Sequence, residues 1–165
     1  MRIPIVMVTL VLMSAFGSSQ GWQPPSSSSA AQAASFIAEL ARNSPQHDGF
    51  PLRRYQAQDL DGDGVSEVLE YVSAYEKVVG LLNIELAPAF DWVNVYRYRD
   101  GKYAEDTGAF GNFLAERRSL YEFWLRVLEH PAVLDKDSQE VVKANQREFR
   151  DTLSGFLSRI RGFAR

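Results

Sequence analysis

Cysteine is absent from this chain of 165 residues, and histidine occurs only twice. Without cysteine the protein has no disulfide bonds, and it lacks the residue to which the lipid of a lipoprotein is attached. The absence of cysteine and the scarcity of histidine also argue against a zinc site, because structural zinc is held mainly by these two residues. An excess of basic residues is missing too, since the net charge is −3. We therefore expect no nucleic-acid partner, because such a partner requires a basic surface that neutralises phosphates.

No apolar run reaches the roughly 18 residues that a membrane-spanning helix requires. The first segment instead has one early charge at Arg2, an apolar core over residues 3–13 and small residues from Ser14 onward. A membrane anchor is the alternative interpretation, but the apolar run breaks at Ser14. The pattern predicts a secretory signal peptide over residues 1–17, cleaved after Gly17. We therefore expect a periplasmic or secreted protein with no stable membrane insertion after cleavage.

The remaining chain divides into a leader and one domain. Residues 18–29 contain two adjacent prolines and four consecutive serines, a composition typical of a flexible leader. Residues 30–165 have a length that suits a single domain. At its start, alanines and the spacing of Phe36 and Leu40 predict a helix over residues 30–43.

The middle of the chain is rich in strand-forming residues and predicts a small antiparallel sheet around residues 53–104. The expected strands cover residues 52–58, 68–75, 81–86, 92–98 and 102–104. Asp100-Gly101, between the last two strands, is a dipeptide that favours a two-residue type I′ hairpin turn. The last two strands should therefore be neighbours.

From Asn112 onward the apolar residues recur with a helical period. The first stripe comprises Phe113, Leu114, Leu120, Phe123, Trp124, Val127 and Leu128. This helix should end at His130, before Pro131. A second helix should open at Asp137, which forms a capping-box pattern with Glu140. Two amphipathic helices joined by a short link predict an antiparallel hairpin that covers the sheet, so the expected fold class is α+β.

One stretch has a spacing that itself implies chemistry, and it reads Asp-Leu-Asp-Gly-Asp-Gly-Val-Ser-Glu from residue 59 to residue 67. Like charges about 5 Å apart repel by roughly 3 kcal/mol per pair at an effective dielectric near 20, and a divalent cation reverses that effect. Ligands that are all oxygens select a hard cation, and a complete protein cage suits Ca²⁺ better than Mg²⁺. The expected calcium ligands are Asp59, Asp61, Asp63, Val65 (through its backbone carbonyl) and Glu67.

Two structural contexts fit this loop. Glu70 stands at the twelfth position from Asp59, which completes an EF-hand pattern and would place a helix after the loop. Against the EF-hand, Ser66 occupies the eighth position, where an apolar residue is usual, and the chain contains no second hand. Whether Glu70 is a ligand depends on which context is right.

The second context is a resemblance. Residues 59–69 resemble the calcium loop of FG-GAP/VCBS-type repeats, which runs Asp-Leu-Asp-Gly-Asp-Gly-x-x-Glu and continues as a strand. Residues 95–103 are also similar to the hairpin that commonly follows in exported bacterial proteins of this kind. The resemblance covers residues 53–104, a single repeat, and implies a structural calcium site that links strands in a protein of binding or adhesion. We favour strand-loop-strand because strand formers flank the loop.

The chain contains no phosphate-binding loop, no dinucleotide fingerprint and no serine in a G-x-S-x-G context. We therefore expect no enzyme activity and no catalytic residues. The expected function is a non-catalytic module that binds another protein, such as a periplasmic inhibitor or immunity protein against a cell-wall hydrolase. A structural or adhesion module of the cell envelope is the alternative, and an EF-hand-type calcium protein is a further one. Aromatic residues expected to be exposed on the sheet would form the contact surface: Trp92, Tyr96, Tyr98 and Tyr103. Ordinary cross-strand packing is the alternative interpretation of each of them.

Overall fold

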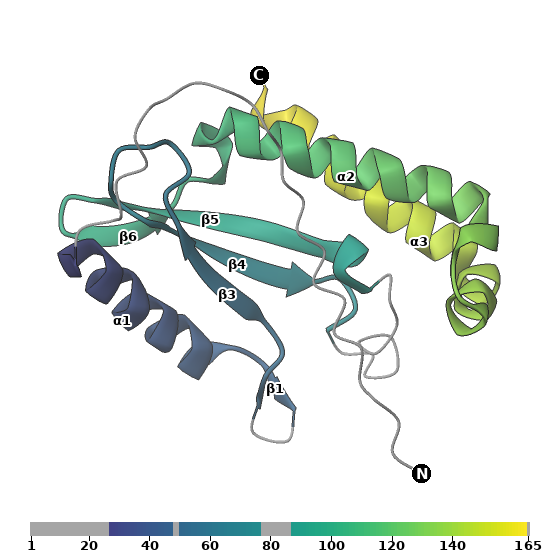
Figure 1. Cartoon of the computed structure of the whole chain (residues 1–165), viewed down its shortest axis with the longest axis horizontal. Coiled ribbons are helices and arrows are strands. Elements are labelled where there is room, and N and C mark those ends of the chain that lie inside the picture. The colour runs from purple at the N-terminus through teal and green to yellow at the C-terminus, as the bar shows by residue number, and fades with distance from the viewer. Residues whose placement is uncertain (1–26, 48–49, 77–86, 165) are drawn as a thin grey trace, which may run out of the picture.

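The computed structural model describes residues 27–47, 50–76 and 87–164. Figure 1 shows a β-sheet that lies between an N-terminal helix and a hairpin of two long C-terminal helices. The helices are α1 (Ser27–Asn43), α2 (Gly111–Glu129) and α3 (Lys136–Phe163). This arrangement confirms the α+β fold class that the sequence predicts.

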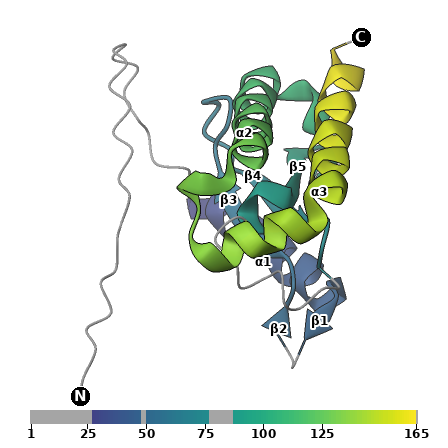
Figure 2. The same cartoon turned by 90° about the vertical axis from the view of Figure 1, so that its right-hand side faces the viewer.

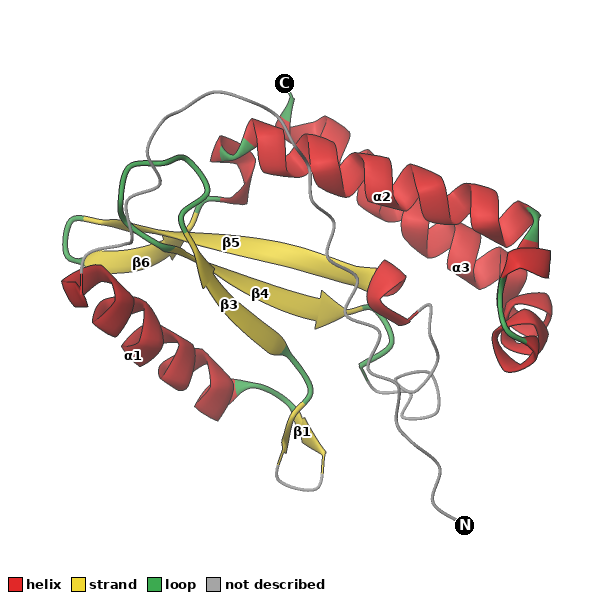
Figure 3. Cartoon of the chain, in the orientation of Figure 1, coloured by secondary structure: helices red, strands yellow, loops and turns green. Residues whose placement is uncertain are grey.

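The sheet has four antiparallel strands in the order β3-β4-β5-β6, so sequence neighbours are also spatial neighbours (Figure 3). The strands are β3 (Arg54–Gln58), β4 (Glu67–Ser73), β5 (Asp91–Arg99) and β6 (Lys102–Glu105). A two-stranded sheet pairs β1 (Gln46–His47) with β2 (Phe50–Pro51). Short 3-10 helices are η2 (Ala87–Phe90), η3 (Thr107–Ala109) and η4 (Pro131–Val133). The signal peptide over residues 1–17 and the expected strand over residues 81–86 lie outside the described residues.

The turn between β5 and β6 is the two-residue hairpin that its sequence predicts. Asp100 and Gly101 have φ values of 53° and 82°, and the residues that flank them, Arg99 and Lys102, pair with each other. Positive φ at both central positions is what a type I′ turn requires, and aspartate and glycine tolerate it best. The turn therefore fixes the register of the β5–β6 pair.

The main core lies between α2, α3 and the start of β5. Tyr121, Phe90 and Phe149 are fully buried, and the ring centroids of Phe90 and Phe149 are 4.5 Å apart. Figure 2 shows α2 and α3 side by side in front of the sheet. Full burial of an aromatic side chain of this kind stabilises the fold by about 1.5–3 kcal/mol.

The aromatic residues expected to be exposed on the sheet are instead packed, so that prediction is wrong. Trp92 is only 5% exposed and contacts Phe156 of α3, with ring centroids 5.7 Å apart. Phe36 of α1 stacks on Tyr103, with ring centroids 4.7 Å apart, and meets Tyr96 edge-on at 5.2 Å. Tyr98 is half-buried beside Tyr103. The aromatic residues that alternate along β5 are therefore packed against helices and do not form a free surface.

Two helix starts differ from the expected ones. α1 begins at Ser27, so the last residues of the expected leader 18–29 belong to the helix. α3 is capped by Asp135, not by Asp137, because the Asp135 Oδ1 atom accepts the Ser138 N–H at 2.9 Å. Of the two aspartates, only Asp135 has the extended backbone that a cap residue adopts.

Helix α2 ends as predicted but faces the core differently. His130 is its C-cap, and the His130 N–H bonds to the carbonyls of Arg126 and Val127. Phe123 is 48% exposed, although the apolar stripe was expected to include it, whereas Tyr121 is fully buried. Residues two positions apart on a helix are about 200° apart around its axis, so only one of this pair can face the core. Within the described residues, no helix combines the length and the apolarity needed to cross a membrane.

Candidate metal centre

The acidic loop connects β3, which ends at Gln58, to β4, which begins at Glu67. Gly62 and Gly64 have φ values of 78° and 82°, a left-handed backbone that glycine adopts without strain. The Asp59 carboxylate lies inside the curl and accepts the N–H groups of both glycines, at 2.7 and 3.0 Å. The strand-loop-strand context is therefore the observed one.

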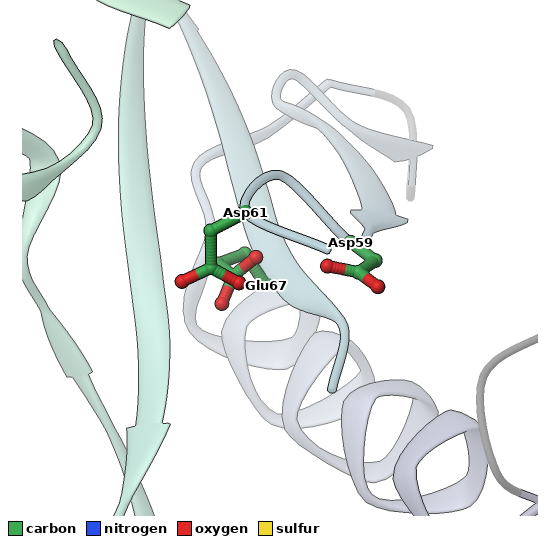
Figure 4. A group of neighbouring side chains, drawn as sticks. All are labelled: Asp59, Asp61 and Glu67. Carbon is green, nitrogen blue, oxygen red and sulfur yellow. The ribbon is translucent and has the colours of Figure 1, made fainter. Parts of the chain in front are cut away.

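Three of the four expected carboxylates converge. Oxygen atoms of Asp59, Asp61 and Glu67 all lie within 4.8 Å of one another, and Figure 4 shows these side chains around the loop. Asp63 does not belong to this group, and its Oδ1 atom accepts the Val65 N–H at 2.8 Å. The expected ligands thus divide into a gathered triad and a pair, Asp63 and Val65, that is bonded within the loop.

Glu67 is the most constrained member of the triad. Its side chain is fully buried, and its Oε2 atom accepts the Leu60 N–H at 2.9 Å. Its Oε1 atom is buried without a hydrogen-bond donor among the described residues. Burial, helped by the nearby carboxylates of Asp61, Asp63 and Asp59 and opposed by the Leu60 hydrogen bond, raises the pKa of Glu67 to about 7. A buried carboxylate oxygen without a partner is unfavourable, so a positive charge or a hydrogen-bond donor beside this atom would stabilise it.

The end of the loop is anchored to two other elements. The buried Ser66 N–H donates to the Ser29 Oγ atom of α1 at 2.9 Å. The Ser66 carbonyl accepts the Tyr103 hydroxyl of β6, also at 2.9 Å. A change in the loop would therefore be transmitted to α1 and β6 as well as to the β3–β4 pair.

Arg97 is the residue of this site that sequence reasoning missed. Its Nη2 atom lies 2.6 Å from Asp61 Oδ2 and 3.7 Å from Asp63 Oδ2. Val68 pairs with Tyr96 across β4 and β5, so Arg97, one step further along, lies opposite Glu67. Arg97 and Asp61 are 36 residues apart in the sequence, and only the pairing of β4 with β5 brings them together. A basic residue in the strand expected to pair beside the loop was the available signal.

Glu70 faces the opposite side of the sheet from Glu67 and belongs to a different network. Its Oε2 atom accepts Asn94 Nδ2 at 3.0 Å and the Tyr96 hydroxyl at 2.8 Å, and its Oε1 atom pairs with Arg53 at 3.1 Å. Burial alone raises the pKa of Glu70, but the bonds from Asn94, Tyr96 and Arg53 outweigh it and hold the pKa below its ordinary value.

The EF-hand alternative is therefore wrong for this chain. Residues Glu67–Ser73 form strand β4, whereas an EF-hand requires a helix after the loop. Glu70, the twelfth residue of the pattern, is engaged by Arg53 and points away from the triad. The apparent EF-hand spacing arises because a strand side chain three positions after Glu67 happens to be acidic.

The donor set of the triad fits a hard cation. Every converging side-chain atom is a carboxylate oxygen, the ligand type that calcium and magnesium prefer. A cation here would satisfy the unpartnered Glu67 oxygen and remove the repulsion within the loop. Comparison of the chain with protein-family models, with curated proteins and with solved structures returned no match. The resemblance to FG-GAP/VCBS-type repeats stays a prediction.

Proposed function

We propose that this chain is an exported calcium-binding protein whose ion stabilises the fold at the β3–β4 connection. The observation that carries the proposal is the fully buried Glu67 carboxylate, which clusters with Asp59 and Asp61 and has one oxygen without a hydrogen-bond partner among the described residues. Buried carboxylates are ordinarily paired with a cation or fully hydrogen-bonded. A bound Ca²⁺ supplies the missing charge.

Calcium is favoured over magnesium by the geometry of the donors. The loop backbone is curled around the Asp59 carboxylate, and the same loop contains two further oxygen donors, the Asp63 carboxylate and the Val65 carbonyl. Calcium accepts six to eight oxygen ligands in flexible geometry, whereas magnesium demands an octahedron and retains several waters. Extracytoplasmic calcium modules commonly bind with Kd values of roughly 10⁻⁴ to 10⁻³ M, which suits the periplasmic or secreted location expected from residues 1–17.

The role of the ion is structural in this proposal. The loop is tied through Ser66 to α1 and to β6, so calcium would hold three elements in one arrangement. Glu67 is already in place beneath the loop before any ion arrives, since Leu60 donates to it. Binding therefore requires little rearrangement of the strands.

The non-catalytic protein-binding role, as an inhibitor or immunity protein, rests on a different surface from the one the sequence suggested. Phe123, at 48% exposure, is the large aromatic residue that α2 presents to solvent, and its ring lies against Trp124. Exposed aromatic residues are enriched at protein interfaces. Capture of a periplasmic protein by the wild type and loss of that capture in Phe123→Ser would support this role, and equal capture by both would remove Phe123 from it.

The calcium proposal is tested by titration calorimetry on chelator-treated protein. Wild type should bind one Ca²⁺ per chain, and Asp61→Asn and Glu67→Gln should abolish or strongly weaken binding. Asp137→Asn is the matched control, because Asp137 is an exposed carboxylate in the first turn of α3 with no role in the cap. An absence of calcium heat in the wild type would overturn the proposal.

A further inference from the structure

The cation nearest to the loop carboxylates is part of the protein itself. In the described part of the chain, the ion pairs that reach the loop come from Arg97, at 2.6 Å to Asp61 and 3.7 Å to Asp63. The Arg97 side chain is only 22% exposed. One positive charge therefore already sits against two of the five expected calcium ligands.

The Arg97 guanidinium also contacts an aromatic ring. It lies over the ring of Phe110, 5.6 Å from the ring centroid, and Phe110 is a buried residue at the N-cap of α2. A cation packed on an aromatic face is attracted to the ring in addition to its carboxylate partners. The contact with Phe110 therefore favours this position of the Arg97 charge also when another cation arrives.

Arg99 provides an internal comparison. It lies two residues further along β5, on the same face of the strand, but pairs with Asp106 at 3.5 Å and is 61% exposed. The structure thus has two arginines of the same strand and orientation, of which only Arg97 contacts the loop.

We propose that Arg97 is a built-in counter-cation of the loop, which competes with calcium for Asp61 and Asp63 and so sets the calcium concentration at which the site fills. This inference rests on the proposed calcium function. In the ion-free protein Arg97 screens the repulsion between the loop carboxylates. When calcium binds, Asp61 and Asp63 exchange the guanidinium for the ion, and the arginine charge remains close to a divalent cation.

Two consequences of opposite sign follow. Removal of the Arg97 charge should destabilise the ion-free protein, because the carboxylates lose their only observed cation partner in the described part of the chain. The same change should tighten calcium binding, because a positive charge no longer faces the ion. A single charge beside a divalent ion at a hydrated surface corresponds to a change in Kd of about tenfold.

The experiment measures calcium affinity by calorimetry and the melting temperature in chelator for wild type, Arg97→Gln and Arg99→Gln. Arg97→Gln should bind calcium about tenfold more tightly than wild type and should melt at a lower temperature in chelator. Arg99→Gln should match wild type in affinity, since it removes the same charge from the same strand face away from the loop. Arg97→Lys, which keeps the charge, should stay close to wild type in affinity.

Equal or weaker calcium binding by Arg97→Gln, in a background where wild type binds, would overturn this inference and leave the calcium function standing. The inference also fails if Arg97→Lys tightens binding as much as Arg97→Gln, because the charge would then not be the cause. If none of the four proteins binds calcium, the proposed function fails together with the inference. Circular dichroism of each variant confirms that the compared proteins are folded.

Discussion

Two buried glutamates lie three residues apart on β4, and their carboxylates have opposite electrostatic surroundings. Glu70 is surrounded by donors, among them Arg53, Asn94 and Tyr96, and its pKa is held below the ordinary value. In the described part of the chain Glu67 has one backbone donor and one oxygen without a partner, and its pKa is raised to about 7. The two side chains face opposite sides of the same sheet, so the difference lies in their neighbours alone.

The Glu70 carboxylate is neutralised by donors of the protein itself, whereas the Glu67 carboxylate is not. The Glu70 network is complete within the protein and ties β3, β4 and β5 together through Arg53, Asn94 and Tyr96. Glu67 has no cation partner within the described residues, since Arg97 contacts Asp61 and Asp63 rather than Glu67. A buried carboxylate that lies next to other carboxylates and is not paired with a basic residue is typical of a metal site rather than of a structural ion pair.

The largest effect on stability should come from replacing Glu70. Glu70→Ala leaves Asn94 and Tyr96 without their buried acceptor and reduces the partners of Arg53, so we expect a loss of about 3 kcal/mol in the free energy of unfolding. Urea denaturation measures this loss. Calcium affinity should stay within about twofold of wild type. A severe loss of calcium binding in a folded Glu70→Ala protein would place Glu70 in the metal site and contradict the comparison.

Removing calcium should have the next largest effect. A ligand bound only by the folded state stabilises it by about 2.7 kcal/mol at a hundredfold excess over Kd. For a domain of this size, that corresponds to a melting temperature lower by roughly 10 °C in chelator. Thermal unfolding followed by circular dichroism, with calcium and with chelator, gives the shift. Identical melting curves would contradict a structural role for the ion.

Glu67→Gln should change stability with the opposite sign to Glu70→Gln. The amide removes an ionised group that is buried beside three other carboxylates, so the calcium-free protein should become more stable at pH 8, by about 1–3 kcal/mol. Glu70→Gln should instead destabilise it, because Arg53 loses a charged partner. Denaturant titrations of both variants in chelator make the comparison directly. Destabilisation of the calcium-free protein by Glu67→Gln would show that its charge is balanced after all.

The pH dependence of the calcium-free protein should sharpen the contrast further. The pKa of Glu67 is about 7 in the folded state, above its ordinary value of 4.5, so the folded chain holds a proton that the unfolded chain has lost between those values. Stability should therefore fall as pH rises from 4.5 to 7, by at most about 1.4 kcal/mol per pH unit.

Glu70 should act in a separate window. Its pKa is lowered from 4.5, so the stability that it contributes is present above that pH and is lost as the pH falls through its folded value. Melting temperatures between pH 3 and pH 8 in chelator should pass through a maximum near pH 4.5–5 from these two groups. A Glu67→Gln variant with the same decline toward pH 7 as wild type would show that another group causes it.

The features that sequence reasoning predicted are local ones. The Asp100-Gly101 turn depends on two adjacent residues whose backbone preferences are strong, and the structure contains it as expected. The carboxylate triad depends on alternation within nine residues, and its members Asp59, Asp61 and Glu67 do converge. The helix hairpin follows from apolar spacing over many turns, which averages out errors at single positions.

The features that it missed depend on contacts between distant segments. Trp92 has the spacing of an exposed strand aromatic, but Phe156 of α3, more than 60 residues further along, covers it. Arg97 reaches the loop only because β4 and β5 are paired in one register. Asp137 has the stronger local signal for a helix cap, because Glu140 completes a capping box, but Asp135 is the cap because the backbone leaves η4 extended only through Asp135.

The central claim, that the open charge of Glu67 is a calcium ligand, is tested most directly by proton release on calcium binding. Calcium titrated into chelator-treated protein at pH 6.5, in buffers of different ionisation enthalpy, reports the number of protons released per ion. Because the pKa of Glu67 is raised to about 7, wild type should release a substantial fraction of one proton per bound calcium, and Glu70→Gln should release the same. Binding without proton release, or unchanged binding by Glu67→Gln, would contradict the claim.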